Sequence, residues 1–276
     1  MSIFRKNKKT KSRDGLSIQE ERKHLLNDQS DFYIREAYKT LRTNVSFALN
    51  NEEGCKIVAM TSAQACEGKS ITTLNLAIST AMTGSKVLVI DCDLRRSKVS
   101  RLLQLRPKVG LSNLILNPKL LQEAILPTEI QNLDVILSGS VPPNPSELLG
   151  SQHMQQLLDE LRNTYDYVFL DSPPVNVVTD AAVLAPRCDG VLLLVRANQS
   201  ERGSVIHAVK QLEYSKAKIL GFILNGVDME RLFYGHKKYD YRKYRYGGYG
   251  YEYEYGSSMP LAFAAEQAEE AEAEGK

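Results

Sequence analysis

The stretch that decides the fold is KIVAMTSAQACEGKSITTLNLAISTAMTG, residues 56–84. Residues 56–62 form an apolar run typical of a strand buried on both faces, and residues 69–84 have the pattern of a helix. The loop between them, SAQACEGKS (62–70), places Gly68, Lys69 and Ser70 where backbone N–H groups, an ammonium and a hydroxyl can hold phosphates and magnesium. Its fit to GxxxxGK[ST] is imperfect, because Ala63 stands where the motif has its first glycine. The strand–loop–helix order nevertheless favours a phosphate-binding loop.

Short apolar runs alternate with amphipathic stretches through the rest of the chain. Helical patterns cover SELLGSQHMQQLLDELRN (146–163) and SERGSVIHAVKQLEYS (200–215). This alternation predicts one doubly wound α/β domain over residues 31–233, with a mostly parallel sheet and helices on both faces. Ligands bind such sheets at the carboxyl ends of the strands. The expected strands after the first are 86–91, 132–139, 165–171, 190–195 and 217–225.

Composition predicts a single core flanked by two polar tails. The chain has 276 residues, of which 43% are hydrophobic and 25% charged, enough for one substantial core. Residues 1–30 include the basic run RKNKKTKSR (5–13), and we expect this segment to be disordered. Residues 257–276 end in an acidic Ala/Glu stretch with no identifiable chemistry. The net charge of +2 hides this layout, so it argues neither for nor against nucleic acid.

The cysteines and apolar runs exclude several classes of protein. Cysteines at 55, 66, 92 and 188 form no CxxC pair and no metal-ligand spacing, which favours reduced thiols and argues against zinc. The N-terminus has positive charge but no apolar stretch behind it, and the longest aliphatic runs are too short to span a bilayer. We therefore expect a protein that is neither exported nor membrane-spanning.

Three carboxylates follow apolar strands of the predicted sheet. VLVIDCDLRR (87–96) contains Asp91 and Asp93, and YVFLDSPP (167–174) contains Asp171. A single aspartate at a strand end is more often a turn or a helix cap. Three of them beside the GKS loop favour a magnesium–nucleotide site, because Mg²⁺ prefers hard oxygen ligands.

The stretch KKYDYRKYRYGGYGYEYEYG (237–256) contains eight of the fourteen tyrosines and no aliphatic residue. Such a composition cannot bury enough apolar area to offset the ordering of its backbone. We therefore predict a solvated tail over residues 234–256. Considered alone, its Tyr, Arg and Gly residues are also compatible with stacking on nucleic acid.

Together these features resemble the bacterial protein-tyrosine kinases (BY-kinases) of capsule and exopolysaccharide assembly. That family consists of P-loop ATPases related to partition and septum-site ATPases. The matching segments span about residues 35–255 in the family's order. They are EAYKTLRTN (36–44), the GKS loop and its helix, VIDCDLR (89–95), PPNPSELL (142–149), VFLDSPP (168–174) and the tyrosine stretch.

The resemblance implies a role for each site residue. Lys69 would bind the β- and γ-phosphates of ATP and act in catalysis, and Ser70 would ligate Mg²⁺. Asp171 would hold the metal through water, with Asp91 acting catalytically in the same shell, and Asp93 would be the base that takes the tyrosine proton. Asn225 resembles an adenine-reading asparagine, although a strand-ending turn explains it nearly as well. The nucleotide-binding loop would comprise Ala65, Cys66, Glu67, Gly68, Lys69, Ser70 and Ile71.

Three departures from the family pattern concern the loop, the aspartate motif and a helix. Ala65-Cys66 replaces the usual Pro-Gly, which removes a glycine where backbone freedom is useful. Ser97 follows the Arg pair where the family commonly has proline. Glu36, Lys39 and Arg42 correspond to an ExxRxxR helix that packs between subunits of a ring, and Lys39 cannot reproduce a bidentate guanidinium contact. The alternative for these three residues is a solvated helix face with i,i+3 pairing.

The resemblance also makes the tyrosine tail the substrate, phosphorylated in trans. About 20 flexible residues reach roughly 25 Å, comparable to the distance to a neighbouring site in a compact ring. Each phosphate adds roughly −1.5 to −2 charges, so we expect phosphorylation to loosen the oligomer. The implied autophosphorylation sites are Tyr239, Tyr241, Tyr244, Tyr246, Tyr249, Tyr251, Tyr253 and Tyr255.

The same resemblance implies a cellular setting. It predicts a cytoplasmic protein held at the inner face of the membrane by a separate transmembrane activator, a polysaccharide co-polymerase. A cognate tyrosine phosphatase is a further expected partner, and nucleic acid is not expected. The alternative from another class is a positioning ATPase, in which nucleotide drives dimerisation and no phosphate is transferred to protein.

Overall fold

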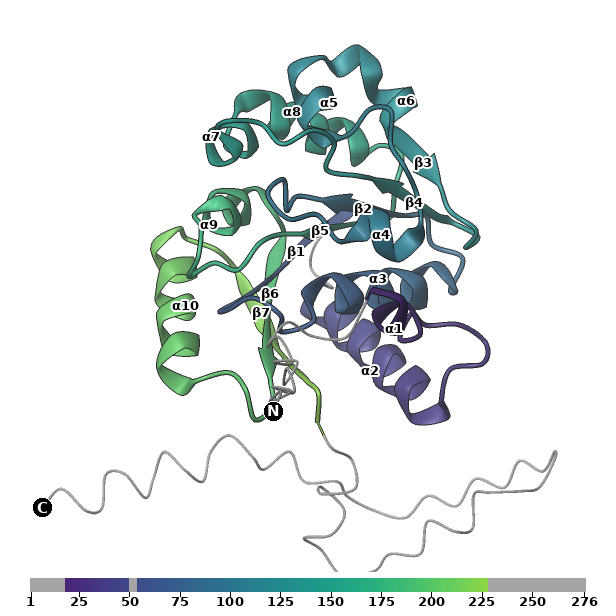
Figure 1. Ribbon diagram of the computed structural model, residues 1–276, viewed down its shortest axis with the longest axis vertical. Coiled ribbons are helices and arrows are strands. Elements are labelled where there is room, and N and C mark those ends of the chain that lie inside the picture. The colour runs from purple at the N-terminus through teal and green to yellow at the C-terminus, as the bar shows by residue number, and fades with distance from the viewer. Residues whose placement is uncertain (1–17, 50–53, 228–276) are drawn as a thin grey trace, which may run out of the picture. The chain divides into compact units, whose positions relative to one another are not determined.

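A computed structural model describes residues 18–49 and 54–227, which fold around a seven-stranded sheet (Figure 1). The strand order is β3-β4-β2-β5-β1-β6-β7. All neighbouring pairs are parallel except β3 and β4, so the predicted mostly parallel sheet is confirmed. The strands are β1 (Lys56–Ser62), β2 (Val87–Asp91), β3 (Ile125–Pro127), β4 (Leu133–Ile136), β5 (Tyr167–Asp171), β6 (Gly190–Arg196) and β7 (Ile219–Asn225).

Helices cover both faces of the sheet, as the apolar strands require. Figure 1 shows α2 and α3 on one face and α8 and α10 on the other, and a separate buried cluster lies under each set. The helices are α1 (Ile18–Arg22), α2 (Phe32–Ala48), α3 (Lys69–Ala81), α4 (Val99–Leu103), α5 (Leu111–Leu116), α6 (Leu121–Ala124), α7 (Pro145–Leu149), α8 (Gln152–Leu161), α9 (Asp180–Leu184) and α10 (Arg202–Tyr214), with 3₁₀ turns η1 (Pro118–Leu120) and η2 (Ala185–Arg187).

The short helices α4, α5, α6 and α9 were not expected from the sequence, and one strand and one longer helix also differ from the expectation. Strand β3 was not expected, because Ile-Leu-Pro is too short to show a period, and its proline fits only an edge position. The helix expected over 146–163 is two helices, α7 and α8, with Gly150 at the break. A Cβ at Gly150 would lie 2.7 Å from Val183 Cγ1, and the Ser151 hydroxyl accepts a hydrogen bond from Met154 N (3.2 Å) to start α8. The break therefore lets α7 approach α9 closely.

The N-terminal segment is more ordered than the expected boundary at residue 31 implies. Residues 18–30 contain α1 and a turn, and Leu26 is buried in the cluster under α2 and α3. Leu26 N donates to Asn75 Oδ1 (2.8 Å), and Asn75 Nδ2 donates to the His24 carbonyl (2.8 Å). Disorder was the wrong expectation for this part, because Asn75, deep in α3, supplies hydrogen-bonding groups that sequence composition does not reveal.

Within the described ranges, no helix combines the length and the apolar character needed to cross a bilayer. Residues 1–17, 50–53 and 228–276 lie outside the described part of the chain. The tyrosine cluster and the acidic segment are therefore among the sequence predictions that the structure does not describe.

Candidate active site

The loop between β1 and α3, predicted to bind phosphate, contains two residues in the left-handed backbone conformation. Gly68 precedes α3 with a left-handed φ of 101°, and a Cβ there would lie 2.3 Å from Asn225 Nδ2. Only glycine fits such a position without a shift of its neighbours. Cys66 is also left-handed, with φ 64°, although it has a side chain. Cys66, which stands where the family has glycine, therefore adopts a backbone conformation that favours glycine.

Contacts from β6, β7 and the segment after β6 hold this loop in place. Asn225 Nδ2 donates to the Glu67 carbonyl (2.9 Å), and Arg196 Nη1 donates to the Cys66 carbonyl (3.0 Å). The buried Glu67 carboxylate accepts hydrogen bonds from Gln64 N (3.0 Å) and from the Ser200 hydroxyl. The sequence did not single out Arg196 and Ser200, since their partners lie 130 and 133 positions away.

Asp91 and Asp171 lie side by side at the carboxyl edge of the sheet. They end the adjacent parallel strands β2 and β5 and are register partners, and both are almost fully buried. Burial and the neighbouring Asp171 raise the pKa of Asp91 well above its ordinary range. Burial likewise raises the pKa of Asp171 to about 6, although the Lys69 ammonium and the Ser70 hydroxyl lower it. The charge of Lys69 therefore offsets the burial of these two neighbouring carboxyl groups only in part.

This carboxylate pair has the character of a cation site. Asp171 Oδ1 is buried and has no hydrogen-bond partner among the described residues. Lys69 and Ser70, which begin α3, act electrostatically on the same carboxylate. Mg²⁺ prefers hard oxygen ligands, and three groups here can supply them: Asp171 Oδ1, the Ser70 hydroxyl and the Asp91 carboxyl. The residues present therefore fit a bound Mg²⁺.

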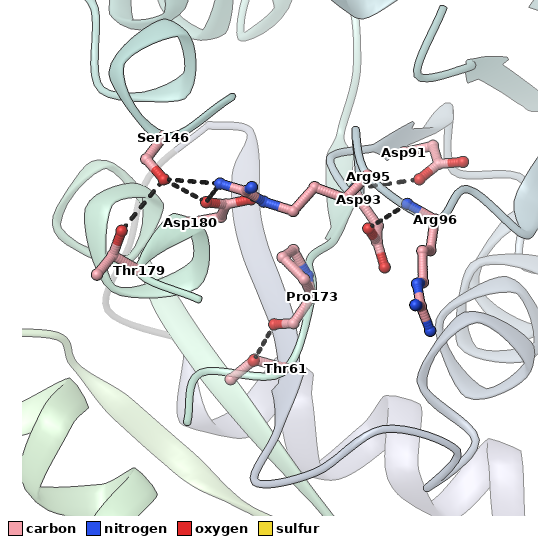
Figure 2. A network of polar contacts seen from close by, with 9 residues as sticks. All are labelled: Thr61, Asp91, Asp93, Arg95, Arg96, Ser146, Pro173, Thr179 and Asp180. Carbon is pink, nitrogen blue, oxygen red and sulfur yellow. Dashed lines mark hydrogen bonds and ion pairs between the residues drawn. The ribbon is translucent and has the colours of Figure 1, made fainter. Parts of the chain in front are cut away.

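Asp93 lies in the loop after β2, held against this pair. Its N–H donates to Asp91 Oδ1 (3.2 Å), and its Oδ1 accepts from Arg96 N (2.9 Å) (Figure 2). Oδ2 of Asp93 has no hydrogen-bond partner among the described residues. Ser97 Oγ donates to Asp91 Oδ2 (2.5 Å), so the serine that replaces the family's proline binds the buried acid.

A second network ties the Asp93 loop to α7 and α9 (Figure 2). Arg95 Nε donates to Asp180 Oδ2 (3.0 Å) and Arg95 Nη2 donates to Asp180 Oδ1 (3.1 Å). Asp180 is fully buried, and the Ser146 hydroxyl donates to its Oδ1 (2.5 Å) while accepting from Thr179 Oγ1 (3.1 Å). The sequence singled out the segment that contains Ser146, but gave no signal for Asp180 or Thr179.

The remaining predicted residues lie apart from this site. Glu36 and Lys39 form an exposed i,i+3 ion pair on α2 (2.6 Å). Arg42 Nη1 donates to the carbonyl of Ser79 (2.6 Å), near the end of α3 opposite the loop. The Glu36–Lys39 pair matches the charged-face alternative, and ring contact for the three residues remains a prediction. The eight cluster tyrosines, Tyr239 to Tyr255, fall outside the described residues.

Known proteins are similar to this chain in sequence. Residues 55–221 match the family described as AAA domain. Tyrosine-protein kinase YwqD of Bacillus subtilis is 39% identical over 75% of this chain and 85% of that kinase. Tyrosine-protein kinase CpsD of Streptococcus agalactiae is 38% identical over 78% of this chain and 93% of that kinase. The chain belongs to the bacterial tyrosine-protein kinases.

Solved structures agree with this membership. The kinase domain of Escherichia coli tyrosine kinase ETK is 34% identical, with a TM-score of 0.69 over 80% of both chains. The chimeric protein CapA2B2 is 36% identical, with a TM-score of 0.68 over 72% of this kinase and 88% of that chain. The septum site-determining protein MinD of Pyrococcus horikoshii, complexed with Mg-ADP, is 22% identical with a TM-score of 0.54, which shows a shared fold alone. The predicted family and fold are therefore confirmed.

Proposed function

We propose that this kinase transfers the γ-phosphate of ATP to the tyrosines of its own cluster at 237–256. The observation that carries this proposal is the position of Asp93. Its carboxylate stands beside the buried Asp91–Asp171 pair and keeps one oxygen without a partner among the described residues. A phosphate-binding loop, a cation site and a proton acceptor in one place are the parts that phosphoryl transfer to a hydroxyl requires.

The loop residues Ala65 to Ile71 would hold the nucleotide, with Lys69 on the β- and γ-phosphates. Ser70, Asp91 and Asp171 would hold Mg²⁺, which when bound neutralises developing charge on the phosphate oxygens. Asn225 would face the adenine. Its contact with the Glu67 carbonyl supports a further role in holding the loop.

Asp93 would receive the proton of the attacking tyrosine. A tyrosine hydroxyl has a pKa of about 10 and is a poor nucleophile at neutral pH. As the new bond from the tyrosine oxygen to phosphorus forms, the bond to ADP breaks and the proton moves to the carboxylate. The hydrogen bonds from Arg96 N to Asp93 Oδ1 and from Asp93 N to Asp91 support this role, because they restrain the base without occupying Oδ2.

The wider function rests on the resemblance to the BY-kinases. We infer phosphorylation in trans within a ring of copies, with Glu36, Lys39 and Arg42 at the contact, and control of capsular or exopolysaccharide synthesis. A separate transmembrane activator would hold the kinase at the inner face of the membrane, in the cytoplasm, and a tyrosine phosphatase would reverse the reaction. Added phosphate would overturn the tail's positive charge and loosen the ring.

Mass spectrometry of the purified chain after incubation with ATP and Mg²⁺ tests this proposal. We expect phosphotyrosine within 237–256, and none on Lys69→Met or on a chain with all eight cluster tyrosines changed to Phe. An active chain mixed with Lys69→Met should phosphorylate the inactive copy if transfer occurs in trans. ATP hydrolysis by the unmodified chain without any phosphotyrosine would instead favour a positioning ATPase.

A further inference from the structure

A run of cations follows Asp93 without a carboxylate among them. The chain has seven Lys and Arg residues between positions 94 and 122, and the next carboxylate after Asp93 is Glu123. An unbroken run of one sign raises the local concentration of an oppositely charged partner. The seven are Arg95, Arg96, Lys98, Arg101, Arg106, Lys108 and Lys119.

Two of these cations are neutralised within the fold. Arg95 makes the bidentate contact with Asp180 already described. Lys98 Nζ lies 3.2 Å from Glu21 Oε1 of α1. Their charges are therefore satisfied by the domain itself.

Four others lie within fifteen residues after Asp93, and we call them together the basic face: Arg96, Arg101, Arg106 and Lys108. All four are exposed, and none belongs to an ion pair between described residues. Arg96 donates its N–H to Asp93 Oδ1, and Figure 2 shows its side chain extending from the loop in a different direction from that of Arg95. Arg101 is on α4, and the other two follow α4 within five residues of its end. Arg96 thus lies next to the proposed proton acceptor, and the other three cations follow it along the chain.

The chain itself contains a complementary segment. Residues 266–274 hold five glutamates and no Lys or Arg, and they follow the tyrosine cluster. We propose that the basic face binds this acidic segment and so docks the tyrosine cluster beside Asp93; the docking of tyrosines rests on the proposed function. The glutamates are Glu266, Glu269, Glu270, Glu272 and Glu274.

Chain length and topology permit this docking. Tyr255 and Glu266 are eleven positions apart, which spans at most about 40 Å when extended. An acidic segment bound at residues 101–108 therefore leaves the cluster within reach of Asp93. Strand β7 is parallel to β6 and ends at Asn225, at the same edge of the sheet as Asp91 and Asp171. The segment can thus come from the same copy or from a neighbour.

An acidic peptide fits the basic face better than a lipid surface does. Because Arg96 N donates to Asp93 Oδ1, a flat bilayer bound through Arg96 would lie against the loop that carries the proposed base. A narrow peptide can bind there and leave the base accessible. Exposed charge pairs are individually weak and are screened by salt, so we expect moderate, salt-sensitive docking that affects substrate binding more than chemistry.

Transfer between two distinguishable chains tests the proposal. The substrate is the Lys69→Met chain, and the enzyme is an active chain whose cluster tyrosines are Phe and whose five tail glutamates are Gln. We expect Arg101→Gln/Arg106→Gln/Lys108→Gln in the enzyme to raise the KM for the substrate chain about 10-fold, with kcat and ATP hydrolysis unchanged. The matched control, Lys86→Gln/Lys210→Gln/Lys216→Gln, removes three exposed charges elsewhere and should change nothing.

A double-mutant cycle identifies the partner of the basic face. Changing the five glutamates of the substrate to Gln should raise KM by the same factor, and combining both changes should add little. A rise in KM that is independent of those glutamates would overturn the proposal, as would an equal rise in the control. Varying the enzyme concentration of the unmodified chain then separates docking within one copy, which is concentration-independent, from docking between copies.

Direct binding decides the proposal even if no phosphate is transferred to tyrosine. A labelled peptide of residues 257–276 should bind the full chain with Gln at the five positions, and the triple variant should weaken this binding about 10-fold. Vesicles of phosphatidylcholine with phosphatidylserine test the lipid alternative. If the triple variant loses vesicle binding but keeps peptide binding, the face is a lipid surface and the proposal is wrong. Failure of transfer with intact peptide binding would count against the proposed function alone.

Discussion

The two edges of the sheet use acidic residues in opposite ways. At the amino edge, Asp189 precedes β6 and accepts hydrogen bonds from Ile57 N (2.7 Å) and from both terminal nitrogens of Arg162 (2.9 Å each). Arg162 also donates to the Cys55 carbonyl (2.7 Å). At the carboxyl edge, Asp91 and Asp171 face each other, and Asp171 Oδ1 lacks any partner among the described residues.

This difference separates a site that stabilises the fold from the proposed cation site. The Asp189 carboxylate is almost fully hydrogen-bonded, so burial of its charge is compensated. At the carboxyl edge, hydrogen bonds from Ser97 and Asp93 N to Asp91 and the charge of Lys69 near Asp171 offset burial only in part, so the ionised form is disfavoured and the pKa of both acids is raised. Two carboxylates are therefore buried side by side at a cost in stability, and a bound cation would reduce that cost.

Removing the Asp189 contacts with Ile57 N and Arg162, which we call the amino-edge clamp, should cause the largest change in stability. Asp189→Ala leaves Arg162 and Ile57 N without their acceptor, and we expect a loss of about 3 kcal/mol in the free energy of unfolding. Urea titration of the nucleotide-free chain measures this loss. Asp159→Ala, an exposed residue of α8, serves as the control and should cost less than about 0.5 kcal/mol. Equal losses of stability in both variants would show that the amino-edge clamp contributes no more to stability than an exposed aspartate does.

Removing the charge of Asp171 at the carboxyl edge should increase the free energy of unfolding, whereas Asp189→Ala should decrease it. The pKa of Asp171 is raised to about 6, so the folded state binds this proton more tightly than the unfolded state. The associated stability is present below about pH 4 and is lost as the pH rises through about 6. In the metal-free chain at pH 7.5, Asp171→Asn should therefore stabilise the fold by on the order of 2 kcal/mol.

The pH dependence checks this explanation. The stability difference between Asp171→Asn and the unmodified chain should shrink as the pH falls below about 6 and approach zero below about pH 4, because Asp171 is then protonated in both the folded and the unfolded chain. Magnesium should stabilise the unmodified chain and not the variant, measured as a shift in melting temperature without nucleotide. A destabilised variant at pH 7.5 would contradict the contrast between the two edges.

A substitution of Arg95 tests whether its ion pair with Asp180, at the carboxyl edge of the sheet, affects catalysis. Arg95→Lys keeps the charge but loses the bidentate geometry that holds the Asp93 loop to α9. We expect kcat for tyrosine phosphorylation to fall about 10-fold, with the KM for ATP unchanged, because only the position of Asp93, the proposed base, shifts. Arg96→Lys has no such pair to lose and is the matched control. A rise in the KM for ATP instead would mean that Arg95 supports the nucleotide loop.

Sequence reasoning succeeded where one local pattern determines the structure. The apolar runs ending in Asp91 and Asp171 sit in adjacent parallel strands, so their pairing follows from the fold class. The groups that surround them could not be predicted, because each is a single polar residue brought in from a distant segment. Asp180 lies 85 positions from Arg95 and begins a short helix, a place where an aspartate is usually only a cap.

The phosphate-binding loop shows the same limit. Gly68 was predicted from the motif, and its contact with Asn225 explains why glycine is required there. The Ser200–Glu67 contact was missed, because a serine before a helix indicates a cap and not a partner 133 positions away. Ordering of residues 18–30 was missed for a related reason, since their hydrogen bonds depend on the side chain of Asn75.

The smallest expected effect concerns the loop itself, where the sequence departs from its family. Cys66 adopts φ 64° and is exposed, so its side chain gains little from packing while its backbone is strained. Cys66→Gly relieves that strain but increases the entropy of the unfolded chain, and the two effects largely offset each other. We expect a net stabilisation of about 0.5 kcal/mol by urea titration. Cys66→Ala keeps the strain and should change stability less, so a stabilisation by Ala equal to that by Gly would assign the effect to the thiol and not to the backbone.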